Sequence, residues 1–193
     1  MTSPQTLSDA DRRLLAGWAA DCATRVLPLL DADASSLALV RDAVARAHAY
    51  GRGGSTAAAE IRQRMVAVTA AGAATTPAGA AAARAAGQAS AVAHLAAHAL
   101  GAAAYAAKAV SLAHPDRPEA VDDELRWQVA HLTQEQAAAL RRLPLLESVP
   151  SGPLGPGLLS RGVLGRAIRE IQARIGDDVD GGRPAPAPAG HHP

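Results

Sequence analysis

Four side chains that could bind a ligand or transfer protons recur at helical spacing in the middle of the chain. His94, His98, Tyr105 and Lys108 fall within roughly 80° of one another when successive residues are placed about 100° apart, as in an α-helix. Lys108 is the only lysine, and every other basic residue is arginine. Imidazole, phenol and ammonium groups on one face predict a polar pocket or a contact line, so these four are our candidate binding residues.

This stripe allows three interpretations. His94 and His98 could both reach one metal ion, but a stable site needs a further ligand, and no glutamate stands between them as in a zinc-protease helix. The two histidines could instead be hydrogen-bonded in the core beside Tyr105, or they could contact a ligand or partner. We expect no catalytic residues, no metal and no cofactor. The alternative is a small-molecule- or metal-binding helical bundle, or an enzyme, centred on His94, His98, Tyr105 and Lys108.

The remaining reactive or aromatic residues are interpreted as structural. Cys22 lies on the apolar side of its segment with Trp18, which indicates a buried thiol and not an activated nucleophile. Trp18 and Trp127 are interpreted as core anchors. Asp122–Glu124 are interpreted as the solvent-exposed start of a helix. The glycine-rich run at 51–54 is interpreted as a turn between helices because no phosphate-loop lysine follows it.

The elements that must position the stripe are predicted to be helices. The 193 residues are 49% hydrophobic, yet only 2% are aromatic and phenylalanine is absent. Most of the apolar residues are alanine, which is the best helix former, whereas strands favour the β-branched and aromatic residues that are scarce here. The fold class is therefore all-α, and alanine-rich helices must approach closely to bury enough apolar surface.

Caps and apolar periodicity predict a compact antiparallel array of about six helices over residues 8–146. The predicted segments are 8–29, 35–50, a third from Ser55 carrying Ile61, Met65 and Val68, 76–114, one from about 116–118, and 133–144. Unbroken, the fourth would be about 57 Å long at about 1.5 Å per residue. A domain of this size is only about 40 Å across. We therefore expect a break between Gly87 and Gly101.

The composition changes after residue 147. Residues 148–157 are rich in proline, glycine and serine and are predicted to be a linker. Residues 158–176 are predicted to form an amphipathic helix that ends at Gly176 and packs back on the domain or pairs with a second copy. Its apolar stripe consists of Leu164, Ile168, Ile171 and Ile175. Residues 177–193 are predicted to be a disordered, dispensable tail.

Charge and targeting signals narrow the class of protein. The chain has 19 basic and 18 acidic residues, a net charge of +1, which argues against a nucleic-acid partner. Residues 85–107 lack charged side chains, but their alanine, glycine and histidine content favours a buried helix over a membrane span. The N-terminus lacks the pattern of a signal peptide, and there is a single cysteine. We expect a soluble cytoplasmic protein with no membrane association.

Four pieces of the sequence together resemble a known family. They are WAADCATRVLPLL at 18–30, ARAHAYGRG at 45–53, ARAAGQASAVAHLAAHALGAAAYAAKAV at 83–110, and RWQVAHL at 126–132. With their spacing they cover roughly residues 8–146, and they are similar to the immunity-5-like family of bacterial polymorphic-toxin systems. The third piece is the most specific.

The resemblance implies a small helical protein that neutralises a cognate toxin by binding it. Related chains often carry an aromatic residue at the position of His48 or Tyr50 and a histidine at the position of Gln88. The glutamine found here disfavours a histidine cluster. The leading hypothesis is therefore an inhibitory binding protein without enzymatic activity, whose partner is a cognate toxin protein.

Overall fold

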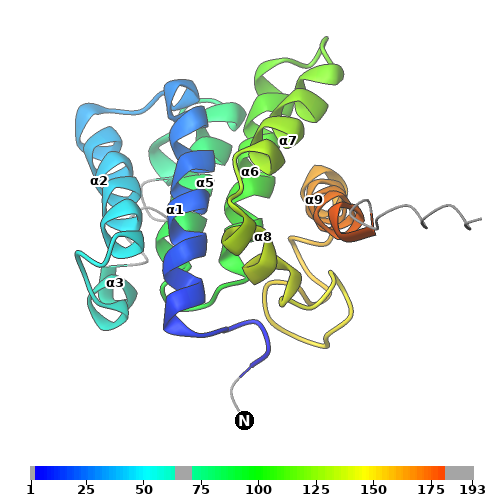
Figure 1. Ribbon diagram of the computed structural model, residues 1–193. Coiled ribbons are helices and arrows are strands. Elements are labelled where there is room, and N and C mark those ends of the chain that lie inside the picture. The colour runs from blue at the N-terminus through cyan, green and yellow to red at the C-terminus, as the bar shows by residue number, and fades with distance from the viewer. Residues whose placement is uncertain (1–2, 64–70, 181–193) are drawn as a thin grey trace, which may run out of the picture.

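The computed structural model describes the backbone of residues 3–63 and 71–180, and these residues form helices, turns and loops with no β-strand (Figure 1). The expected all-α class is confirmed. The described residues form eight α-helices, one more than expected, because the long segment after Thr76 is divided in two. They are α1 Asp9–Val26, α2 Ala34–Gly51, α3 Ala57–Gln63, α5 Pro77–Ala91, α6 His98–Ala113, α7 Glu119–Ala130, α8 Gln134–Arg141 and α9 Gly162–Asp180.

Polar side chains cap the helix starts as the sequence indicated. Ser8 and Thr133 open α1 and α8 with reciprocal capping boxes, in which the third helical residue also bonds back to the cap. Thr76, followed by Pro77, opens α5 and accepts a hydrogen bond from the first turn at 3.0 Å. These local signals fix where α1, α5 and α8 begin, independently of how the helices later pack, whereas α6 and α7 begin without a side-chain cap.

The cap of α3 differs from the expected one. Thr56, and not Ser55, accepts a hydrogen bond from the first turn of this helix, at 3.3 Å. The carbonyl oxygen of Ser55 accepts from the guanidinium of Arg13 at 3.1 Å, which holds Ser55 in the turn after α2. Met65 and Val68, expected on this helix, lie outside the described residues.

The break expected in the long segment is confirmed. The chain turns back between α5 and α6, where hydrogen bonds join residues three apart and the N–H of Ala97 donates to the carbonyl oxygen of Gln5 at 3.2 Å. The reversal brings the alanine-rich faces of α5 and α6 together. Neither half, nor any other helix of the described residues, is long and apolar enough to cross a membrane.

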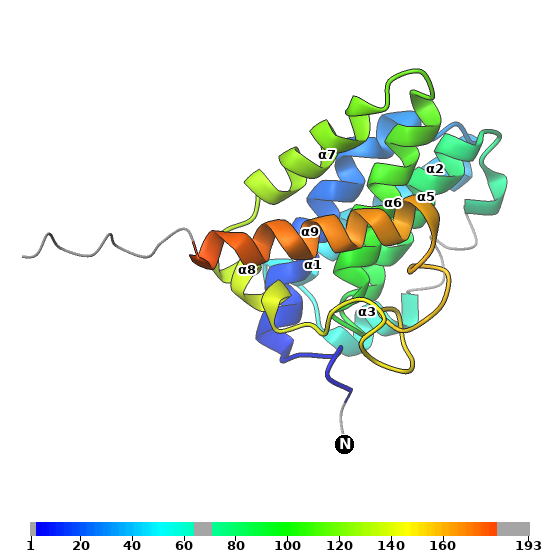
Figure 2. The ribbon, with the colours of Figure 1, turned by 90° about the vertical axis from the view of Figure 1, so that its right-hand side faces the viewer.

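The centre of the molecule is the α5–α6 pair, with α1 and α2 packed on one side and α9 lying across α6 on the other (Figures 1 and 2). The buried residues of α5 and α6 are mostly alanine, so these helices pack closely. The larger fully buried side chains at this centre come mainly from the neighbouring helices and include Trp18, Tyr50, Leu15, Leu100 and Ile168.

The C-terminal helix shares this core. The apolar stripe of α9 is buried against the array, through Leu164, Ile168, Ile171 and Ile175. The helix begins at Gly162, four residues later than expected, and continues through Gly176 to Asp180. Gly176 does not end it because a glycine stops a helix by adopting a positive φ, and Gly176 is not among the positive-φ residues. Residues 177–180, expected in the tail, are therefore helical, and residues 181–193 lie outside the described residues.

The segment expected as a linker lies against the array. Gln5, which is 2% exposed, donates from Nε2 to the carbonyl oxygen of Ser151 at 2.7 Å and accepts from the N–H of Leu154 at 3.0 Å. Leu154 is fully buried. The prolines and glycines of 148–157 thus shape turns that carry the chain across the surface from α8 to α9.

Candidate functional site

The four candidate binding residues come from α6 and the turn before it. His98, Tyr105 and Lys108 lie on one face of α6, whereas His94 is exposed in the turn after α5. The break therefore divides the expected stripe and puts His98 at the first residue of α6. Lys108 is partly exposed and makes no hydrogen bond or ion pair with any residue that the structure describes.

His98 is held as a neutral side chain. Its Nδ1 lies 2.9 Å from the Oε1 of Gln88 on α5, so that Nδ1 carries the proton and donates it to the amide oxygen. Burial, with a smaller contribution from the charge of His94, lowers the pKa of His98 to about 4. Over the described residues, no three His, Cys, Asp or Glu side chains are arranged to hold a metal ion.

Tyr105 is only 4% exposed, and burial raises its pKa, with Arg84 of α5 acting in the opposite direction. The stripe thus splits into two environments. His98 and Tyr105 pack between α5 and α6, while His94 and Lys108 face solvent at least in part. The hydrogen bond to Gln88 and the packing between α5 and α6 explain the position of the His98 side chain without a bound ligand.

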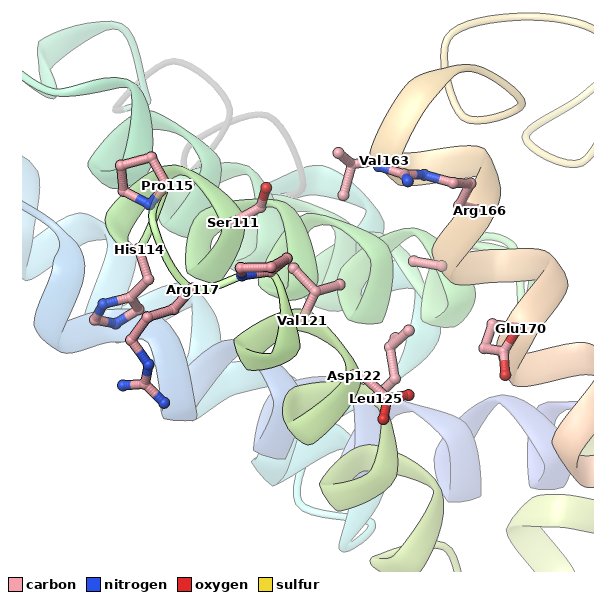
Figure 3. A pocket seen from close by; sticks show the side chains of 12 residues that line it. Ser111, His114, Pro115, Arg117, Val121, Asp122, Leu125, Val163, Arg166 and Glu170 are labelled. Carbon is pink, nitrogen blue, oxygen red and sulfur yellow. The ribbon is translucent and has the colours of Figure 1, made fainter.

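A cleft of about 360 Å³ separates the α6–α7 turn from α9 (Figure 3). Its acids are already bound, because Asp122 forms ion pairs with Arg126 at 2.8 Å and with Arg174 of α9. Arg174 also bonds Glu170 at 2.9 Å. These pairs join α9 to α7, and they leave a cleft with an apolar floor of Val121, Leu125, Val163 and Ala167.

The other side of α7 carries a stack of three side chains. The guanidinium carbon of Arg25, at the end of α1, lies 4.4 Å from the ring centroid of Trp127 on α7. The ring of His131 stacks on Trp127 at a centroid distance of 4.0 Å and an interplanar angle of 26°. Trp127 is partly exposed, and Arg25 and His131 are exposed. We call these three residues the α1–α7 stack.

A buried polar network fixes the stack from behind. Glu124 is 3% exposed, and its Oε2 accepts from Nε of Arg25 at 2.6 Å while its Oε1 accepts from Nε2 of Gln128 at 2.9 Å. The Nε2 of Gln128 also donates to the backbone carbonyl oxygen of Ala103 at 3.1 Å. The backbone carbonyl oxygen of Gln128 accepts a hydrogen bond from the indole N–H of Trp18 at 2.9 Å. The network joins α1, α6 and α7.

A second cleft, of about 400 Å³, lies beside the stack. Its walls come from the end of α1, the end of α6 and the start of α7. Apolar residues line it at Val26, Pro28, Leu29, Val110 and Ala120, and polar residues at Arg25, His114, Arg117, Asp123 and Glu124. Figure 3 shows that the side chains of His114 and Arg117, which also line this second cleft, point away from α9.

The sequence interpretation missed the stack. Trp18 is a core anchor as expected, but Trp127 is partly exposed and contacts the guanidinium of Arg25 and the ring of His131. The signal available was the four-residue spacing of Trp127 and His131 on one predicted helix face. Cys22 is buried as expected, and burial, with Glu124 acting next, raises its pKa well above the usual value.

The described residues form an all-α array that carries the α1–α7 stack on its surface. The family model described as Imm-5 like putative immunity protein matches residues 5–135, about two thirds of the chain. The chain therefore belongs to this family. The match includes Arg25, Glu124, Trp127 and His131, whereas α9 lies beyond it. No curated protein and no solved structure matches the chain.

Proposed function

We propose that this protein neutralises a cognate bacterial toxin in the cytoplasm by binding it, with no catalysis of its own. Membership of the immunity-protein family supports a role that requires a toxin as partner. A binding inhibitor needs only a complementary patch of about 800 Å² on its own side. We assign that patch to the surface around the α1–α7 stack.

The observation that carries this assignment is the setting of Trp127. Tryptophan and arginine are the side chains most enriched among residues that dominate binding energy. Trp127 is partly exposed, so a partner can cover it, and both the guanidinium of Arg25 and the ring of His131 pack against its ring. Because the ring is already ordered, binding loses little side-chain entropy there.

The experiment uses the full chain and the toxin domain encoded by the neighbouring gene. The wild-type protein is expected to bind this domain and to protect cells that express it. Trp127→Ala is expected to weaken the affinity by about 2 kcal/mol, roughly 30-fold. Trp127→Phe is expected to recover part of this loss, since a smaller ring can still stack.

Arg126→Ala provides the matched control. Arg126 precedes Trp127 on α7 and is exposed, and among the described residues it pairs only with Asp122 and Asp123, whose side chains are about half exposed. Its loss should leave affinity within about threefold of wild type. A wild-type chain that neither binds nor protects would refute the proposed function. Equal affinities of Trp127→Ala and Arg126→Ala for the toxin would contradict the assignment of the contact surface to the α1–α7 stack.

A further inference from the structure

Among the described residues, the guanidinium of Arg25 donates a hydrogen bond only through its Nε. Nε donates to Glu124 at 2.6 Å, and the plane of the group lies over Trp127. The two terminal amino groups make no hydrogen bond with any residue that the structure describes, and the side chain is 42% exposed. A fixed guanidinium with two parallel free donors matches the geometry of a carboxylate.

Each of the two acidic residues that line the cleft beside Arg25 has an arginine partner. Glu124 is bound by Arg25 itself, and Asp123 forms an ion pair with Arg126 at 2.8 Å. The cleft contains two further cationic or protonatable side chains, His114 and Arg117. Within the described part of the chain Arg117 pairs only with Glu119, at 3.3 Å, where both side chains are about 60% exposed, so this pair is weak.

The imidazole of His114 makes no side-chain hydrogen bond within the described part of the chain. Figure 3 shows His114 and Arg117 directed to the same side of the α6–α7 turn. Two arginines and a histidine therefore line this cleft together with five apolar residues and two carboxylates, and both carboxylates are paired with arginines. An anionic group with a short aliphatic stem fits this arrangement.

We propose that this cleft receives an aspartate or glutamate side chain of the toxin, whose carboxylate is bound by the terminal amino groups of Arg25. The stem of that side chain packs on the apolar wall formed by Val26, Leu29 and Val110. Arg117 adds positive charge to the lining, and His114 adds an imidazole that can form a hydrogen bond. This inference rests on the proposed function and specifies which chemical group of the partner the stack and its cleft recognise.

The test compares Arg25→Lys with Arg126→Lys in the full chain, with the toxin domain encoded by the neighbouring gene as the probe. A lysine at position 25 can keep the ion pair with Glu124, so the protein should fold, but it loses the fork of donors and the plane that lies on Trp127. We expect Arg25→Lys to weaken binding by about 10- to 100-fold. Arg126→Lys should bind like wild type.

The second arm identifies the partner group. Each acidic residue on the toxin surface is changed to its amide, and one such change should weaken binding to wild type but have no further effect on Arg25→Lys. Wild-type binding together with equal affinities of the two lysine variants would overturn the inference and leave the proposed function standing. A wild-type chain that does not bind would overturn both.

Discussion

The side-chain oxygen of Gln88 occupies the space over Gly101 where a Cβ atom would stand. The same oxygen accepts the hydrogen bond from His98, and the Cδ1 of Leu159 lies 3.3 Å from that Cβ position. Gln88 is on α5, while Gly101 and His98 lie one turn apart on α6. A residue without a side chain is therefore what lets Gln88 reach across α6 and pair with His98.

Gly101→Ala should break this arrangement. The added methyl group would displace Gln88 from His98 and press on Leu159, at a cost of about 1–3 kcal/mol in the free energy of unfolding. Urea denaturation followed by circular dichroism measures the change. Gly176→Ala is the control: no atom outside the helix lies within 4 Å of its Cβ position, so it should stabilise α9 by about 0.5–1 kcal/mol. A neutral or stabilising effect at position 101 would contradict the packing.

The His98 pairing predicts a pH dependence of stability. The pKa of His98 is about 4 in the folded protein against 6.5 when unperturbed. Between these values the unfolded chain binds more protons than the folded one. The free energy of unfolding should therefore fall by about 2–3 kcal/mol as the pH falls from about 6.5 to about 4.

His98→Asn isolates this contribution, because its amide can donate to Gln88 without titrating. Its stability profile should be flatter over this pH range than that of wild type. His94→Asn, at the exposed neighbouring position, should keep nearly the wild-type slope. Thermal unfolding at stepped pH values compares the three proteins, and parallel profiles for wild type and His98→Asn would rule out the assigned shift.

Glu124→Gln should loosen the stack without removing it. Both neighbours of this side chain, Nε of Arg25 and Nε2 of Gln128, are donors, so only a carboxylate can accept from both. An amide must turn one of its own donors toward one of them, which should cost about 1–3 kcal/mol of stability. Denaturation curves measure this cost, and Asp123→Asn, exposed on the same helix, should stay within about 0.5 kcal/mol of wild type.

Lys108 is a proposed contact residue that forms no hydrogen bond or ion pair with any described residue. Because the described residues around it offer no carboxylate within bonding distance, Lys108→Arg and Lys108→Ala should each change stability by less than about 0.5 kcal/mol. Thermal melting provides the measurement. A larger loss in both would indicate a structural role, whereas loss of toxin binding alone would extend the contact surface to α6.

Local signals in the sequence were sufficient for most helices and insufficient for the site. The caps at Ser8, Thr76 and Thr133 act within one turn, so they could be predicted without knowledge of the fold. The Arg25–Glu124 pair joins residues 99 positions apart, and the Gln5–Ser151 bond joins residues 146 apart. The residues that neighbour each partner in the sequence do not predict such pairs, because the pairs depend on how the helices pack. For the same reason Trp127 could not be distinguished from a core residue.

The alanine interior of α5 and α6 has a consequence for recognition. An alanine has no side-chain rotamers to lose on burial, whereas each buried leucine or isoleucine loses about 0.5–1 kcal/mol of conformational freedom. Such a core also has no alternative side-chain arrangements through which it could adapt to a partner. Any shape adjustment during association must therefore come from the partner or from the exposed loops, and the helical face should dock as a rigid body.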